Sequence, residues 1–178
     1  MSAIRTILGR QVWDSRGRPT VEVEVTLESG ATGRAIAPSG ASTGSREALD
    51  RRDGGKRLGG YGVNAALTAV NGEIRSRLSG LDAIDQAGID RAMIALDGTP
   101  QKTRLGGNAI VATSSAVAWA AAAEQRMPLW RHLRRLSDLD PDAQHIPAPM
   151  IQIFGGGRHA GNRIDIQDYL ILAVGARS

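Results

Sequence analysis

The sequence lacks cysteine. This excludes disulfide bonds and thiolate metal sites and favours a reducing compartment, so we expect a cytoplasmic protein. Long apolar runs are also missing: none follows Met1 and none reaches about 18 residues, so we expect neither a signal peptide nor a membrane span. Aromatic residues are scarce (three Trp, two Tyr, one Phe) and are not interleaved with basic residues as a nucleic-acid stacking platform requires.

The basic surplus is modest for the length of the chain. The formal net charge is +4 and the sequence pI is about 10.3. The basic residues stand in short pairs (Arg51-Arg52, Lys56-Arg57, Arg134-Arg135) rather than in one stripe. We therefore expect a solvated basic surface and neither a nucleic-acid nor a membrane partner, with a docking face for an acidic protein as the alternative.

The first third of the chain has the pattern of β-strands. Residues 20–27 alternate Val or Leu with Glu or Thr, which predicts a strand with one solvent-exposed face. Residues 4–13 and 31–37 predict two more strands. The turn residues at 14–19 and a second turn at 28–30 separate the three. Short links between adjacent strands favour a three-stranded antiparallel meander.

Helical patterns follow the strands. Apolar residues between Val63 and Leu81 recur every three or four positions, which is typical of one amphipathic helix. The other expected helices are at 45–52, 84–96, 108–124 and from Pro128 onward. Strands followed by helices indicate an α+β fold.

The C-terminal part differs from the rest. Residues 137–145 are polar and predict a linker, and two apolar runs follow at 148–154 and 164–174. We interpret these runs as strands of the buried type. Because two strands have no independent stability, they complete another sheet or begin a further unit, and we expect an exposed apolar surface that needs a partner.

Two segments rich in glycine stand out. Residues 38–44 (Pro-Ser-Gly-Ala-Ser-Thr-Gly) have no bulky side chain, and residues 155–162 contain four glycines and His159. Such loops bring backbone N–H groups and hydroxyls close to a ligand, although many are only flexible connections. We interpret the first as a lid and the second as part of the floor on which it closes.

Several short motifs together resemble the enolases in order and spacing. They are Asp14–Thr20, Pro38–Gly44, Glu47-Ala48, Arg52-Asp53, Leu96–Pro100, Leu105–Ile110, Gly156–Ala160 and Asp165–Asp168. The resemblance implies a small N-terminal capping domain over residues 1–143. It further implies that residues 144–178 are the first two strands of an incomplete α/β barrel.

The resemblance also implies a chemistry. Enolases are Mg²⁺-dependent lyases of glycolysis that dehydrate 2-phosphoglycerate to phosphoenolpyruvate. In the family the barrel supplies three metal-binding carboxylates, the lysine base and an assisting glutamate, and none of these positions is present in the 178 residues. We therefore expect this chain alone to be inactive and to work with a chain that carries the barrel, in a homo- or hetero-oligomer.

By the same resemblance, site residues fall in both glycine-rich segments and just after the second. Ser42 is implied as a ligand of the second Mg²⁺, and a hydroxyl is a suitable hard ligand. The implied substrate-binding residues are Ser39, Gly40, Ala41, His159, Gln167 and Asp168, of which His159 and Asp168 are also implied to be catalytic. His132 and His145 receive no such role, and we expect them at the surface or in packing.

Three positions depart from the enolase pattern. Asp168 stands where the family has Glu, and Gln152 and Gly155 stand where it has Asn. Aspartate is shorter by one carbon–carbon bond, about 1.5 Å. A displacement of that size lowers rates by on the order of 10²-fold.

These departures keep other functions open. One alternative is an enolase-like enzyme of phosphonate natural-product biosynthesis, of the carboxyphosphonoenolpyruvate synthase type. Another is a non-catalytic module that binds a partner.

Overall fold

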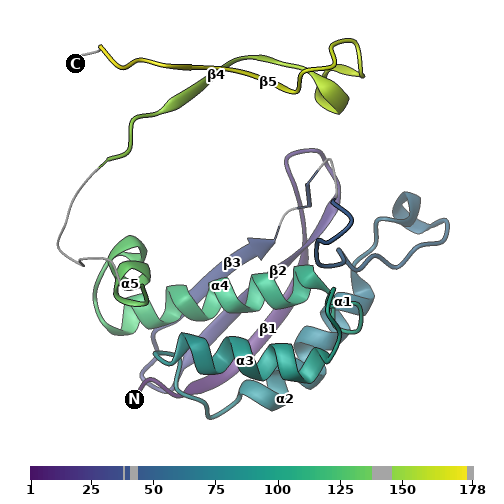
Figure 1. The fold of residues 1–178 in the computed structure, drawn as a ribbon. Coiled ribbons are helices and arrows are strands. Elements are labelled where there is room, and N and C mark those ends of the chain that lie inside the picture. The colour runs from purple at the N-terminus through teal and green to yellow at the C-terminus, as the bar shows by residue number, and fades with distance from the viewer. Residues whose placement is uncertain (38, 41–43, 138–145, 176–178) are drawn as a thin grey trace. The chain divides into compact units, whose positions relative to one another are not determined.

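The computed structural model describes residues 1–37, 39–40, 44–137 and 146–175. It divides into two compact units, the first formed by residues 1–39 and 45–141 and the second by residues 40–44 and 142–178. Figure 1 shows the elements of both, and each unit is described by itself.

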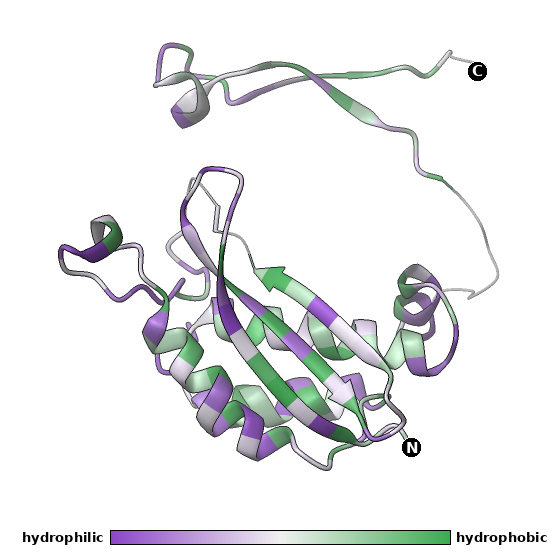
Figure 2. Ribbon diagram, turned by 180° about the vertical axis from the view of Figure 1, so that it is seen from behind, coloured by the Kyte–Doolittle hydropathy of each residue, from purple (hydrophilic) through white to green (hydrophobic). Residues whose placement is uncertain are grey.

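The first unit is built on a three-stranded antiparallel sheet in the order β1-β2-β3. The strands are β1 Ile4–Trp13, β2 Pro19–Leu27 and β3 Thr32–Ala37. Figure 2 shows the alternation of hydrophobic and hydrophilic residues along them. The predicted meander is confirmed, since each strand pairs with its neighbour in sequence.

One expectation about this sheet is wrong. Alternation predicts that Glu22 faces solvent, but only 6% of it is exposed. Arg10, its register partner on β1, donates from Nε to the Glu22 carboxylate, and Arg34 Nε lies 3.5 Å from the same carboxylate. Two long basic side chains therefore cover an acidic residue that the period-two pattern assigned to the open face.

Helices cover the other face of the sheet. A helical segment runs through α1 Asn64–Ala69, the π turn η2 Val70–Ile74 and α2 Arg75–Leu78. It is followed by α3 Gln86–Asp97, α4 Gly107–Glu124 and α5 Leu129–Arg135. A short 3₁₀ turn, η1 Arg57–Gly60, precedes them. The predicted helices near 63–81, 84–96, 108–124 and 128–133 are thus present, and the α+β class is confirmed.

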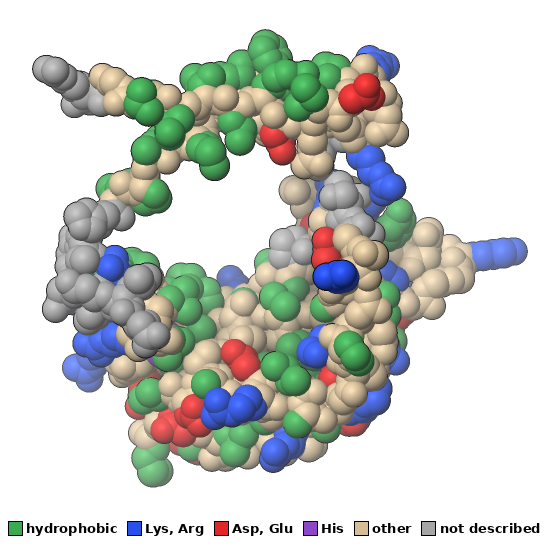
Figure 3. All heavy atoms as spheres, in the orientation of Figure 1, with side chains coloured by type: hydrophobic (Ala, Val, Ile, Leu, Met, Phe, Trp, Pro, Cys, Tyr) green, Lys and Arg blue, Asp and Glu red, His purple; other side chains and the backbone are tan. Residues whose placement is uncertain are grey.

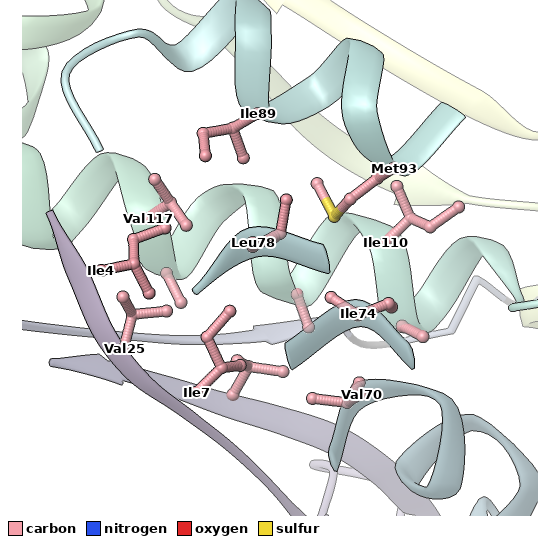
Figure 4. Packing of buried hydrophobic residues seen from close by; sticks show 14 of the residues in the cluster. Ile4, Ile7, Val25, Val70, Ile74, Leu78, Ile89, Met93, Ile110 and Val117 are labelled. Atoms are coloured by element: carbon pink, nitrogen blue, oxygen red, sulfur yellow. The ribbon is translucent and has the colours of Figure 1, made fainter. Parts of the chain in front are cut away.

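The core lies between the sheet and these helices (Figure 4). Ile4, Ile7 and Val25 meet Val70, Ile74, Leu78, Ile89, Met93, Ile110 and Val117 in one buried cluster. Helix α4 lies directly against β3: a Cβ on Gly33 would be 2.2 Å from both Ala116 O and Ala120 N. The small side chains of α4 and the missing side chain at Gly33 permit this close approach.

The helix predicted at 45–52 is absent, because this segment bonds to other segments instead of to itself. Leu49 N donates to Gln101 O and Leu49 O accepts from Gly107 N, both at 2.7 Å. Such long-range hydrogen bonds replace the i to i−4 bonds that a helix would require. Local propensity predicted a helix here, and tertiary partners determined a turn followed by an irregular segment.

The second unit contains two strands, β4 Met150–Gly155 and β5 Asp168–Leu172, with the 3₁₀ turn η3 Gly157–Ala160 between them. The two predicted strands are confirmed. They pair antiparallel, unlike the parallel strands of an ordinary α/β barrel. Of the predicted linker, residues 138–145 lie outside the described part of the chain.

Apolar side chains of this unit are exposed, as expected for strands of the buried type without their neighbours. Figure 3 shows hydrophobic side chains gathered along β4 and β5. Met150 is 70% exposed and Phe154 65%. Paired strands with both faces exposed have little stability of their own.

Candidate functional site

The segment interpreted as a lid begins directly after β3. Ser39 and Gly40 are described, whereas Ala41 and Ser42 lie outside the described residues. The Ser39 carbonyl accepts a hydrogen bond from Arg16 Nη2. The turn between β1 and β2 therefore holds the residue at which the segment leaves the first unit.

Arg16 is itself fixed by Asp14. Asp14 Oδ1 accepts from the backbone N–H groups of Arg16 at 2.9 Å and Arg18 at 2.8 Å. The hydrogen bond from Arg18 is the main cause of the lowered pKa of Asp14. Gly17, at φ +66°, allows the turn to close. The Asp-Ser-Arg-Gly-Arg run thus forms a hydrogen-bonded turn from which Arg16 reaches Ser39.

The other end of the same segment is also held. Gln101 Nε2 donates to Ser45 O at 2.8 Å. Farther along, Asn108 forms two hydrogen bonds with the backbone of Arg51: Oδ1 accepts from Arg51 N at 3.2 Å, and Nδ2 donates to Arg51 O at 3.1 Å. An amide side chain at the start of α4 thus pairs with residue 51 as a neighbouring strand would.

A buried carboxylate shapes the turn that carries Gln101. Asp97 is 3% exposed and accepts from Leu105 N at 2.8 Å and from Thr99 N at 3.0 Å. Burial acts to raise the pKa of Asp97, but the hydrogen bonds from Leu105 and Thr99 hold it below its usual value. Asp97 in the Leu96–Pro100 motif therefore holds the backbone of the turn that precedes α4.

The glycine-rich turn of the second unit is closed by backbone hydrogen bonds. Gly156 N donates to Gln167 O at 2.6 Å, and Gly157 N donates to Ile164 O at 2.7 Å. A Cβ at position 156 would lie 1.9 Å from Ile166 O, and Gly157 has φ +59°. Position 156 therefore requires glycine, and the positive φ favours glycine at 157. His159 lies in the 3₁₀ turn that these contacts position.

Gln167 and Asp168 lie together where β5 begins. Gln167 Nε2 donates to Asp168 Oδ2 at 3.3 Å, and Gln152 Nε2 on β4 donates to Asp168 Oδ1. The carboxylate therefore has an amide donor on each oxygen, and both amides are exposed to solvent on the hairpin. Sequence reasoning noted Gln152 only as a departure from a pattern and missed its contact with Asp168.

The candidate residues are divided between the two units. Ser39 belongs to the first unit, and Gly40, His159, Gln167 and Asp168 belong to the second. Among the candidates that the structure describes, Gln167 and Asp168 are neighbours in sequence and their side chains hydrogen-bond to each other. Sequence reasoning also gave no role to Arg16, Gln101 and Asn108, although all three stand in or beside the motifs already noted.

A metal site is not formed by the residues that the structure describes. In these ranges no group of three or more His, Cys, Asp or Glu side chains is arranged to hold a metal ion. Asp168 already accepts hydrogen bonds on both oxygens. The described donors thus do not fit the principal Mg²⁺ site that enolases usually have, and Ser42 stays a predicted ligand.

His132 is 2% exposed, and its Nδ1 lies 3.0 Å from Gln125 Nε2. It is therefore a packing residue rather than a surface residue, which is one of the two roles expected for it. His145 lies outside the described residues.

Among the helices in the described ranges, none combines the length and apolarity that crossing a bilayer requires.

Comparison with protein families agrees with this arrangement. Residues 4–133 match the enolase N-terminal domain, and residues 143–178 match the enolase C-terminal TIM barrel domain. The first match covers the sheet, helices α1 to α4 and most of α5, and the second covers the β4–β5 hairpin. The chain therefore belongs to the enolase family, of which it carries the N-terminal domain and the start of the barrel.

Proposed function

We propose that this chain is the N-terminal part of a Mg²⁺-dependent, enolase-like lyase that dehydrates 2-phosphoglycerate to phosphoenolpyruvate. The observation that carries the proposal is the end of the β4–β5 hairpin. There Gln167 and Asp168, implied as site residues by the family pattern, are held in contact beside the turn that contains His159.

In this proposal the chain contributes binding and positioning. Gln167, Asp168 and His159 line one side of the substrate site, and residues 39–41 cover it. Ser42 adds a hard oxygen ligand to the second metal ion. Mg²⁺ would supply stabilisation of the negative charge that develops on the substrate carboxylate. Exclusion of water by the 38–44 segment would strengthen the electrostatic interactions inside.

The base and the principal metal ligands would come from barrel strands that residues 1–178 do not contain. The apolar side chains exposed on β4 and β5 support this, because strands of a closed barrel bury such side chains against their neighbours. We propose residues 1–143 as the capping domain and 144–178 as the barrel start, in an oligomeric, cytoplasmic enzyme.

A second function is favoured by one observation. The three departures from the family pattern, Gln152, Gly155 and Asp168, all stand on the same hairpin end. This supports an enolase-like enzyme whose substrate differs from 2-phosphoglycerate, such as one of phosphonate biosynthesis.

Isolation from native cells tests the proposal. The tagged chain is purified from its source, and its partners and native mass are determined. The complex is then assayed for phosphoenolpyruvate formation with and without Mg²⁺. We expect a barrel-containing assembly with Mg²⁺-dependent activity. The proposal would be contradicted by a stable 18.8 kDa monomer that associates with no polypeptide carrying the rest of the barrel.

The same complex tests the non-catalytic alternative. Mg²⁺ and a substrate analogue are titrated in, and cleavage of the 38–44 segment by protease is followed. Protection supports the lyase, whereas unchanged cleavage supports a partner-binding module.

A further inference from the structure

The two edges of the three-stranded sheet differ in how their backbone groups are satisfied. On β1, Ile4 N donates to Leu81 O at 2.9 Å and Ile4 O accepts from Gly80 N at 2.8 Å. Farther along the same edge, the Asn71 side chain accepts from Gly9 N at 2.8 Å and donates to Gly9 O at 3.0 Å. The chain thus covers the β1 edge, which protects it from pairing with other strands.

The edge formed by β3 has no such cover within the described residues (Figure 1). In the turn before β3, Leu27 N donates to Ala31 O. Hydrogen-bonded and non-hydrogen-bonded pairs alternate along an antiparallel ladder, so every second residue of β3 directs its N–H and C=O groups away from β2. These residues are Thr32, Arg34 and Ile36. In the described part of the chain, no other segment bonds to their backbone groups.

A groove lies beside this edge. It has a volume of about 400 Å³ and is lined by the first half of β3, the C-terminal half of α4 and Met127. Trp119, which is 47% exposed, and Met127 give it apolar surface. Because successive side chains of a strand point to opposite faces, a strand added beside β3 would direct every second side chain toward α4. The groove therefore fits apolar side chains at alternate positions of such a strand.

The charges on the open face of the sheet favour an acidic partner. The Arg34 side chain is 63% exposed, and its Nε lies 3.5 Å from the Glu22 carboxylate. Arg10 also donates to Glu22, and it donates to Glu24, the register partner of Arg34. Both carboxylates are thus shared with Arg10, and Arg34 has exposed surface for a further acid. More positive charge follows the groove in sequence, on Arg126, Arg134 and Arg135.

The charge of Arg34 also argues against a second copy of this chain as the partner. Two copies of β3 would pair antiparallel about a two-fold axis. The register that engages all three outward positions places Thr32 opposite Ile36, and Arg34 opposite its counterpart. Like charges directly opposite one another destabilise a strand pair. The edge therefore favours a strand that brings a carboxylate to Arg34.

We propose that the β3 edge and the groove beside it form a docking site for an extended segment of a partner protein in which acidic and apolar residues alternate. The segment adds a fourth strand to the sheet and bonds to the outward backbone groups of β3. Its acidic side chains face Arg34, and its apolar side chains enter the groove beside Trp119. Main-chain hydrogen bonds supply affinity and the side chains supply selectivity. This site is independent of the proposed lyase function.

Titration with a short peptide tests the site on the ¹⁵N-labelled 178-residue chain. The probe is a heptapeptide, blocked at both ends, that alternates valine and glutamate. We expect the backbone amides of Thr32, Arg34 and Ile36 to shift and to exchange more slowly, and the indole N–H signal of Trp119 to shift. A peptide with lysine in place of glutamate should bind about tenfold more weakly, since attraction to Arg34 becomes repulsion.

Two changes separate strand addition from general charge attraction. Thr32→Pro removes an outward N–H and leaves the hydrogen bonds between β3 and β2 in place, because an edge strand tolerates proline at its first residue. We expect it to weaken binding of the valine–glutamate peptide by about tenfold, whereas Thr32→Ala, which keeps this N–H, should bind normally. Arg34→Glu should reverse the order of the two peptides.

Three results would overturn the proposal. Unchanged β3 amides with both peptides would show that this edge accepts no strand. Equal affinity for the glutamate and lysine peptides would remove the selectivity assigned to Arg34. Slower exchange at Thr32, Arg34 and Ile36 that grows with the concentration of the chain alone would assign the edge to a second copy.

Discussion

Replacing Asn108 with alanine should loosen the segment that follows residues 38–44. Asn108 is 7% exposed and makes two hydrogen bonds with the Arg51 backbone, at 3.2 and 3.1 Å. Each contributes about 0.5–1.5 kcal/mol, so the free energy of unfolding should fall by about 2 kcal/mol. Local opening around residue 51 should increase more than global unfolding, because the Arg51 N–H and C=O groups lose the side-chain amide that pairs with them as a neighbouring strand would.

Asn71 provides the matched control for this change. It makes the equivalent pair with Gly9 in β1, accepting from Gly9 N at 2.8 Å and donating to Gly9 O at 3.0 Å. Asn71→Ala should lower stability by a similar amount. Hydrogen exchange measured by mass spectrometry should then rise at residues 49–53 in Asn108→Ala only. Equal exchange at 49–53 in the two variants would refute the reasoning, since the amide of Asn108 would then not anchor this segment.

Three further changes test other parts of the account. Gly33→Ala places a Cβ 2.2 Å from Ala116 O and Ala120 N, so urea unfolding should show a loss of about 1–3 kcal/mol or more; an unchanged midpoint would show that α4 does not lie against β3 as described. Arg16→Gln removes the hydrogen bond to Ser39 O and should speed proteolysis near residue 40, whereas Arg5→Gln should not. Burial, aided by Arg135, lowers the pKa of His132 below its ordinary 6.5, so the native state binds fewer protons than the unfolded chain. Stability from His132 should therefore be complete above pH 6.5 and decline as the pH falls below it, and His132→Leu should flatten this slope between pH 7.5 and 5.5.

The strands and long helices were predictable because local pattern and tertiary burial agree there. Val21, Val23, Val25 and Leu27 alternate with polar residues and are all fully buried. Val70, Ile74 and Leu78 form the predicted stripe and face the sheet. In such segments the hydrophobic period alone determines the element.

Other features depend on partners that are distant in sequence. Residues 45–52 have helical propensity but bond to Gln101, Gly107 and Asn108, which no local pattern reveals. Glu22 is buried because Arg10 is its register partner, and register follows from the turn at 14–18 rather than from either strand.

The candidate site itself stays a prediction. The motif Asp165–Asp168 pointed to Gln167 and Asp168, and the side chains of these sequence neighbours hydrogen-bond to each other. The contact from Gln152 crosses the strand pair and follows from the β4–β5 register, which has an irregularity between Gln152 and Phe154. The roles of all the candidate residues stay predictions: Ser39, Gly40, Ala41, Ser42, His159, Gln167 and Asp168.

The central claim is that this chain supplies the capping domain and the start of a barrel, while the base and principal metal ligands come from other barrel strands. It is tested most directly by assaying the purified 178-residue chain with 2-phosphoglycerate and Mg²⁺, alone and together with the barrel-bearing polypeptide from its native complex. The account predicts no phosphoenolpyruvate from the chain alone and Mg²⁺-dependent formation from the complex. Dehydration of 2-phosphoglycerate by the chain alone would contradict it.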